Sequence, residues 1–141
     1  MRVLIDTNII LDYVLERHPF HAEASEIIML AAGEMFDGYL SAITPVNAYY
    51  VGKKLKNAEH ARSEVRRFVR LFEIAAINKD ILQDAFDLEF KDYEDGVQCA
   101  SAIAEGLDAI VTRNTKDFKK SPIPVYSPSE FLELLQKDSA R

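Results

Sequence analysis

Two short apolar runs end directly in polar side chains, and this pattern strongly limits the fold. The apolar residues 3–5 are followed at once by Asp6, and the apolar residues 109–111 by Thr112. A third polar group, the acidic cluster at residues 92–95, precedes an Ala-rich helical stretch. Short apolar runs that alternate with helical segments predict a parallel sheet covered by helices on both faces. In an open sheet of this kind, polar side chains at the carboxyl ends of separate strands build the active site.

Hydrophobic periodicity and turn signals predict the order of the elements. The expected strands are residues 3–6, 39–42, 74–77, 109–112 and 124–126. The expected helices are residues 9–16, 21–32, 79–88 and 95–105, with further helices that begin near 44, 57 and 127. Thr44 is the expected N-cap of one helix, and Ser127 with Glu130 forms the expected capping box of the last. We therefore expect one α/β domain over residues 1–141, with three layers, four or five short parallel strands, and fraying from residue 137.

Composition narrows the class of protein. The chain of 141 residues is 48% hydrophobic and has one cysteine, Cys99, so an internal disulfide or a cysteine-based zinc site is excluded. No apolar run approaches membrane-spanning length and no signal peptide is evident, so a cytoplasmic protein without membrane association is expected. The net charge of −6 argues against a nucleic-acid partner. That argument fails where acids gather in one site and bases on another face.

Three segments of the chain together resemble the PIN domain family. They are residues 6–8 after the first strand, residues 92–95 before the Ala-rich helix, and residues 111–114 with Asp117 and Phe118. The resemblance runs from Val3 to about Leu135. It implies a ribonuclease, a phosphodiester hydrolase that uses magnesium or manganese. Many VapC-like bacterial members of this size are toxins, so it also implies a homodimer and an antitoxin whose tail blocks the acidic cleft.

The same chemistry can be argued from the residues. Phosphodiester hydrolysis needs an activated water, stabilisation of phosphoryl charge, and help for the departing oxygen, which one or two carboxylate-bound divalent ions supply. Mg²⁺ and Mn²⁺ suit carboxylate ligands. We expect Asp6 and Asp95 to be direct ligands, and Thr112 and Asn8 to orient the acids through hydrogen bonds. The residues expected to complete the site or to hold bound waters are Asp117, Asn114 and Asp92.

Two positions depart from the family pattern. PIN domains typically carry a glutamate where this chain has Asn47, which offers an amide oxygen but no charge. The fourth acid is displaced from the Asn114 position to Asp117. These changes leave open an alternative function, a PIN-like module that binds RNA or protein with weakened or lost catalysis.

Structural roles could also explain these residues. Asn47 lies three residues after Thr44 and could belong to that helix cap instead of having a role in the site. Asp6 could simply cap the following helix, and Asp92, Glu94 and Asp95 could complement a helix dipole. For Glu94 the dipole role is the favoured one.

Basic residues gather in two places that matter for an RNA partner. Arg113, Lys116 and Lys119 flank the last acidic group, and we expect them to position the phosphate backbone of single-stranded RNA. A stripe of arginines, from Arg62 to Arg70, lies opposite the apolar face of its helix. It fits either a solvated surface or a contact with an acidic protein, and the sequence does not decide between them.

Other enzymes with an aspartate after the first strand are disfavoured. A haloacid-dehalogenase-like phosphatase needs an acid two residues after its nucleophile, where this chain has Asn8. A receiver domain needs an acidic pair after its first strand and a phosphoacceptor after its third, where residues 78–80 read Asn-Lys-Asp.

Overall fold

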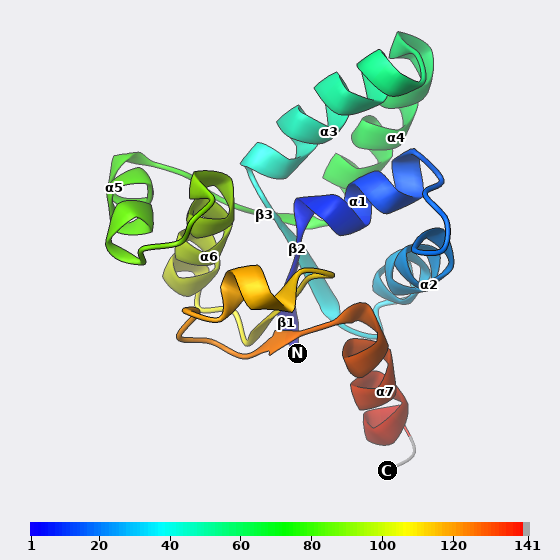
Figure 1. Cartoon of the computed structure of the whole chain (residues 1–141). Coiled ribbons are helices and arrows are strands. Elements are labelled where there is room, and N and C mark those ends of the chain that lie inside the picture. The colour runs from blue at the N-terminus through cyan, green and yellow to red at the C-terminus, as the bar shows by residue number, and fades with distance from the viewer. Residues whose placement is uncertain (140–141) are drawn as a thin grey trace.

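The computed structural model describes residues 1–139 as a five-stranded parallel sheet in the order β3-β2-β1-β4-β5, with helices on both faces (Figure 1). The strands are β1 (Arg2–Ile5), β2 (Asp37–Ser41), β3 (Glu73–Ala75), β4 (Ala109–Val111) and β5 (Val125–Tyr126). The helices are α1 (Thr7–Val14), α2 (His21–Ala32), α3 (Ile43–Leu55), α4 (Ala58–Leu71), α5 (Lys79–Asp87), α6 (Tyr93–Glu105) and α7 (Pro128–Ser139), with a 3-10 helix η1 (Thr115–Phe118). The predicted three-layer α/β fold is confirmed.

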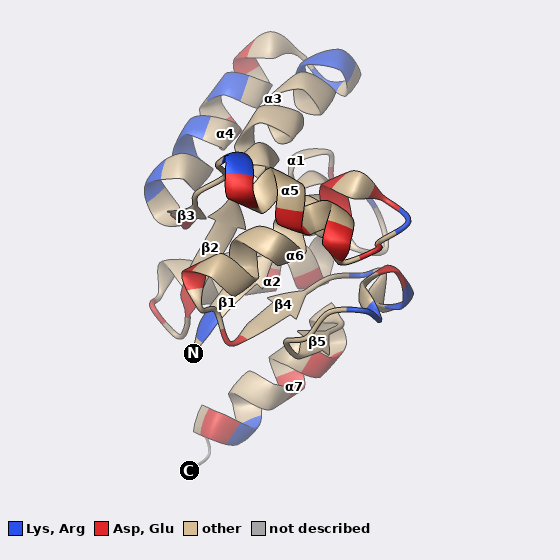
Figure 2. Ribbon diagram, turned by 90° about the vertical axis from the view of Figure 1, so that its left-hand side faces the viewer, with Lys and Arg blue, Asp and Glu red and all other residues tan. Residues whose placement is uncertain are grey.

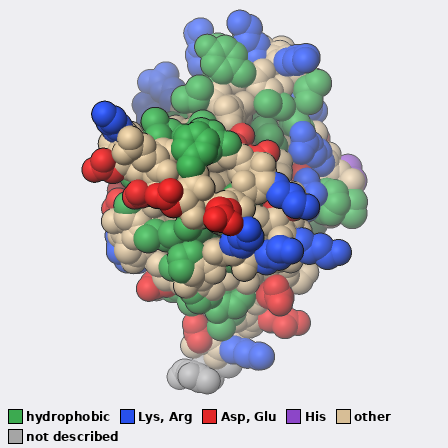
Figure 3. Space-filling model, turned by 60° about the vertical axis from the view of Figure 1, so that its left-hand side comes forward, with side chains coloured by type: hydrophobic (Ala, Val, Ile, Leu, Met, Phe, Trp, Pro, Cys, Tyr) green, Lys and Arg blue, Asp and Glu red, His purple; other side chains and the backbone are tan. Residues whose placement is uncertain are grey.

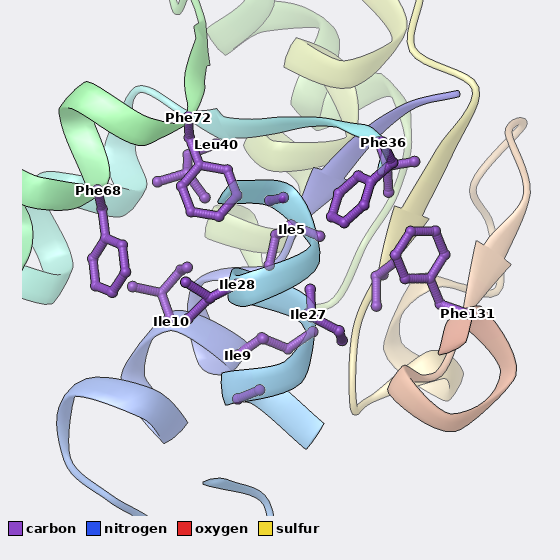
Figure 4. Packing of buried hydrophobic residues seen from close by; sticks show 14 of the residues in the cluster. Ile5, Ile9, Ile10, Ile27, Ile28, Phe36, Leu40, Phe68, Phe72 and Phe131 are labelled. Atoms are coloured by element: carbon purple, nitrogen blue, oxygen red, sulfur yellow. The ribbon is translucent and has the colours of Figure 1, made fainter. Parts of the chain in front are cut away.

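Side chains of the central strand β1 pack into two separate hydrophobic clusters, one on each face of the sheet. Val3 and Ile5 pack with residues of α1, α2 and α7, a cluster seen in Figure 4 around Ile9, Ile27 and Phe131. Leu4 points to the opposite face and packs with buried residues of α6. Successive side chains of a strand alternate between the two faces of the sheet. A strand buried on both sides therefore reads as a continuous apolar run, which explains why residues 3–5 were so clear a signal.

Several predicted helix ends agree with the structure. Asn57 accepts a hydrogen bond from the His60 N–H at 2.7 Å and so caps α4. In the expected capping box, Glu130 Oε1 accepts from the Ser127 N–H at 2.8 Å and Ser127 Oγ accepts from the Glu130 N–H at 3.2 Å. Gly106 ends α6 in the left-handed region at φ 71°, where a glycine costs least.

One prediction about a helix start was wrong, and one short helix was missed. Helix α3 begins at Ile43, so Thr44 lies inside its first turn and is not the N-cap. The Thr44 hydroxyl is instead buried and hydrogen-bonded to the Thr7 hydroxyl at 2.8 Å. The short helix η1 was not predicted. Residues 137–139, expected to fray, continue α7 to Ser139, while residues 140 and 141 lie outside the described part of the chain.

The sheet places the polar ends of two strands side by side. Strand β1 lies between β2 and β4, and Ile5 pairs with Val111 in parallel register. Asp6 continues this pairing through its N–H, which donates to the Val111 carbonyl at 3.0 Å. The next residue of each strand, Asp6 and Thr112, therefore emerges at the same edge. This edge, where the strand order reverses, is where open α/β sheets bind ligands. Within residues 1–139 there is no helix of the length and apolarity needed to cross a bilayer.

Candidate metal and active site

Asp6 lies at the centre of the site, and its carboxylate is almost fully buried, at 1% exposure. Thr112 Oγ1 donates to Asp6 Oδ2 at 2.8 Å, and Gln98 Nε2 donates to Asp6 Oδ1 at 2.9 Å. Asp6 occupies the N-cap position of α1 but its side chain makes no capping hydrogen bond. The capping interpretation of Asp6 is therefore wrong. The carboxylate is held between the end of β4 and the middle of α6.

Gln98 is a residue of the site that the sequence reasoning missed. It is fully buried, and its amide oxygen also accepts from the Thr7 N–H at 3.1 Å. One side chain thus ties α6 both to Asp6 and to the first turn of α1. A weak signal was available, since Gln98 is three residues after Asp95 on a helix of small residues and shares its face.

The N-terminus of α6 brings Asp95 toward Asp6. Asp92 is the N-cap of this helix, and its Oδ1 accepts from the Asp95 N–H at 3.0 Å. Partial burial, together with the charges of Asp6, Asp92, Asp117 and Glu94, raises the pKa of Asp95 to about 7. Burial also raises the pKa of Asp6, although the hydrogen bonds from Gln98 and Thr112 oppose that rise. The carboxylates thus repel one another across a shared space.

That shared space is a cavity of about 580 Å³, which we call the acidic cleft. It gathers side chains from α1, α3, α6 and the segments around them, and acidic segments are visible at the start of α6 in Figure 2. The residues that line it are Asp6, Thr7, Asn8, Leu11, Asn47, Val51, Lys91, Asp92, Glu94, Asp95, Asn114 and Asp117. All five predicted catalytic residues therefore meet in one cleft.

The donor chemistry of the acidic cleft fits a divalent cation. Carboxylate and amide oxygens are the hard ligands that Mg²⁺ and Mn²⁺ prefer. A cation there would offset the repulsion that raises the pKa of Asp95. The fit rests on this chemistry and on the convergence of the donors. In the described part of the chain, no three acidic, histidine or cysteine side chains already stand together at metal-ligating positions.

The predictions for the residues expected to support the acids have different outcomes. The hydrogen bond expected from Thr112 to an acid is present. Asn8 lines the cleft, and within residues 1–139 its side chain makes no hydrogen bond to an acid, although its backbone N–H acts to lower the pKa of Asp6. Asn47 also lines the cleft. Because Thr44 does not cap α3, the capping-box interpretation of Asn47 loses its basis.

The basic residues divide into two groups. Arg113 does not line the acidic cleft and is bound to Asp12, at 2.7 Å from Nε to Oδ2. Lys116 and Lys119 line a neighbouring hollow. The arginine stripe of α4 lines a separate surface hollow with Glu59 and Ser63, and its role stays undecided.

Comparison with known proteins agrees with this geometry. A family model described as PIN domain matches residues 2–116. The chain is similar to Ribonuclease VapC1 of Aquifex aeolicus (strain VF5), with 31% identity over 137 residues that cover 94% of each chain. It is similar to a chain of a toxin–antitoxin complex from Klebsiella pneumoniae, with 29% identity, a TM-score of 0.68, and coverage of 89% of this chain and 97% of that one.

The fold is also shared with a chain of VapBC2 from Rickettsia felis, solved bound to a DNA fragment from its promoter. That match has a TM-score of 0.69 and 24% identity, and covers 90% of this chain and 98% of the other. The receiver and phosphatase alternatives are thereby set aside, and the resemblance carried by residues 6–8, 92–95 and 111–118 is confirmed. The chain belongs to the PIN domain family.

Proposed function

We propose that this PIN domain is an endoribonuclease that cleaves single-stranded RNA with the help of Mg²⁺ or Mn²⁺. The observation that carries the proposal is the convergence of Asp6, Asp95 and Asp117 on one cleft at the carboxyl ends of β1 and β4. The similarity to a protein named Ribonuclease VapC1 supports this reaction class. RNA is the substrate that this relative's name implies, and the lysines near the cleft are suited to its phosphates.

The protein's own part in the reaction is to position the ligands. A bound divalent cation supplies an activated water and offsets charge on the phosphoryl oxygens. Asp6 and Asp95 would hold it, and Asp117 and Asn114, which line the same cleft, would complete the site or hold bound waters. Gln98 and Thr112 each fix one oxygen of Asp6, so this carboxylate is set in place before any ligand arrives.

We further propose that the protein is the toxin of a toxin–antitoxin pair. The Klebsiella pneumoniae relative was solved in a toxin–antitoxin complex. An acidic cleft that binds a cation also attracts a basic peptide, so a basic segment of an antitoxin could occupy the cleft and exclude both metal and RNA. The adjacent reading frame in the genome tests this pairing, since it should encode a small DNA-binding protein with a basic tail.

One experiment tests the nuclease directly. Purified protein is incubated with single-stranded RNA in Mg²⁺ or Mn²⁺, and a parallel sample contains EDTA. We expect fragments only in the presence of metal. The variant Asp95→Asn, purified by the same steps, controls for a contaminating nuclease. Fragmentation that continues in EDTA, or that is equal in this variant, would refute the proposed mechanism.

A second function is favoured by one observation. Asn47 lines the acidic cleft at the position where the family typically has a glutamate, so the site carries one charge fewer. The protein would then bind RNA or an antitoxin with little or no cleavage. Tight RNA binding without fragments at any Mn²⁺ concentration would identify this second function.

A further inference from the structure

A second hollow of about 450 Å³ adjoins the acidic cleft. We call it the lysine groove, because its lining includes four lysines together with Glu89, Phe90 and Asp117. The lysines are Lys91, which precedes α6, and Lys116, Lys119 and Lys120, which lie in and after η1. Figure 2 shows these two basic segments next to each other, although they are far apart in sequence.

The lysine groove is continuous with the acidic cleft. Lys91 and Asp117 line both spaces, so one chain-like ligand could contact both. Basic side chains gather beside an acidic group on the face shown in Figure 3. An acidic site that binds metal and a basic groove beside it have complementary uses. The first is suited to a cation and the second to the phosphates of a nucleic acid.

The lysines are largely free to bind an anion. No carboxylate of residues 1–139 lies within ion-pair distance of Lys91, Lys116 or Lys119, and all three are exposed. Lys120 has one partner, Glu89, at 3.5 Å, and both side chains are on the surface. Such exposed pairs contribute little and are readily exchanged for a phosphate. This local excess of positive charge stands against a net charge of −6 for the chain.

An aromatic ring distinguishes this groove from an ordinary basic patch. Phe90 lines the groove and is only half-buried. Its ring packs edge-to-face against Phe118, with centroids 5.5 Å apart, and Phe118 is fully buried. The buried partner fixes the ring of Phe90. A positively charged groove with an aromatic side chain is the combination that binds single-stranded nucleic acid.

We propose that the lysine groove binds the nucleotide next to the scissile phosphate of a single-stranded RNA. The lysines contact the flanking phosphates, and Phe90 contacts the base or ribose. This inference rests on the proposed function and makes it more specific, because it assigns substrate binding to residues other than the expected metal ligands. Extended polyanions that lack bases, such as acidic peptides, would bind through charge alone.

RNA binding tests the groove independently of cleavage. The full chain carrying Asp95→Asn is titrated with fluorescent single-stranded RNA in EDTA over a range of salt. Changing Lys91, Lys116 and Lys119 together to Gln should weaken binding and reduce the slope of log K against log salt by about 2, at about 0.7 per phosphate contact. The matched control changes Lys53, Lys54 and Lys56 to Gln, which removes the same charge from the end of α3. Equal effects of the two triple variants would overturn the proposal.

Phe90 provides a second, uncharged test. Phe90→Leu keeps an apolar side chain against Phe118 but removes the aromatic face. We expect it to weaken RNA binding by about fivefold or more, in line with about 1–3 kcal/mol for one stacked base, and to leave the salt slope unchanged. Circular dichroism and thermal melts check that each variant is folded. A poly-glutamate peptide serves as the comparison ligand. If it binds with the same affinity as RNA, and Phe90→Leu does not change that affinity, the assignment to RNA would be overturned.

Cleavage kinetics separate this inference from the proposed function. With a wild-type protein that cleaves RNA, the lysine variant should show a raised KM and a nearly unchanged kcat. An unchanged KM would overturn the proposed role of the lysine groove and leave the proposed nuclease activity standing. A wild-type protein that binds RNA through these lysines without cleaving it would support the groove and overturn the nuclease.

Discussion

Arg113 donates two hydrogen bonds to the buried carboxylate of Asp12, from Nε to Oδ2 at 2.7 Å and from Nη2 to Oδ1 at 3.1 Å. Asp12 is 1% exposed, and the guanidinium carbon of Arg113 lies 4.0 Å from the ring centroid of Phe20. The pair links α1 to the segment that carries Asn114 and Asp117. The guanidinium of Arg113 thus has a structural role in this pair, and its expected contact with RNA stays a prediction.

The first prediction follows from this pair. Arg113→Ala should lower the free energy of unfolding by about 3 kcal/mol, because it leaves the carboxylate of Asp12 buried without its bidentate partner. Arg17, whose Nη1 lies 3.7 Å from Asp12 Oδ1, makes a weaker contact, so Arg17→Ala should cost less than about 1 kcal/mol. Urea denaturation of the two variants measures the difference. Equal losses would contradict the assigned role.

The second prediction concerns the charge of Asp95. The folded state holds its pKa at about 7, above the ordinary 3.8, so ionisation of Asp95 costs stability. The free energy of unfolding should therefore fall as pH rises from about 4 to about 7, because Asp95 ionises more readily in the unfolded chain. Asp95→Asn should therefore raise metal-free stability by about 1 kcal/mol at pH 8, a value reduced for solvent screening, with little gain at pH 4. Cleavage should fall by more than about 100-fold, beyond the usual effect of a supporting residue.

Denaturation at the two pH values, with EDTA present, measures the stability change. An Asp95→Asn variant that unfolds more easily than the wild type at pH 8 would favour a structural role for this side chain at the start of α6.

The third prediction is the pH dependence of metal binding. A metal ligand must be deprotonated, and the pKa of Asp95 is raised to about 7 by burial and by neighbouring carboxylates. Mn²⁺ affinity should therefore fall as pH drops from 8 to 6, and binding near pH 7 should release protons. Calorimetry in buffers of different ionisation enthalpy counts the protons. Affinity that is flat over this interval would remove Asp95 from the ligands.

The fourth prediction addresses Asn47. Because this side chain lines the acidic cleft, Asn47→Glu adds a carboxylate oxygen and should tighten Mn²⁺ binding by about tenfold, or about 1.4 kcal/mol. Asn47→Ala is the control and should leave affinity equal or weaker. Calorimetry on both variants decides the matter. If Asn47→Glu binds no more tightly than the wild type, then Asn47 does not face the metal.

The fifth prediction is a homodimer formed through α3 and α4. Pro45, Val46, Tyr49, Tyr50 and Val65 line an apolar hollow of about 340 Å³ on this hairpin, and Tyr50 is 64% exposed. Exposed apolar patches of this kind often mark interfaces. Phe68 in α4 and Phe72 just after it are buried in the core, so they cannot contribute to such an interface.

Light scattering should give twice the chain mass of 16.0 kDa for the wild type. Tyr50→Glu should shift the protein to monomers, because a charge in a two-fold contact meets its own copy. Phe86→Glu is the matched control, since Phe86 is 67% exposed but lies on α5. A wild type that stays at the single-chain mass at all concentrations would rule out the dimer.

The sequence by itself determined the local structure of this protein and identified the acidic residues of its candidate site. Apolar runs, helix caps and glycine stops depend on neighbours in the chain, so the order of strands and helices and the cap at Asn57 could be read directly. Asp6 directly after a strand, Asp95 at the start of a helix and Asp117 in the segment after another strand were enough to predict a shared site.

Only the tertiary structure decided the contacts made across the sheet. Thr112 and Asp6 are 106 positions apart and meet because Ile5 pairs with Val111. Gln98 reaches Asp6 from α6, and Arg113 reaches Asp12 rather than solvent, because the packing of helices on the sheet brings them together. Local sequence fixes which segments become strands and helices. The pairing of distant strands and the burial of polar groups between them depend on interactions that no local pattern encodes.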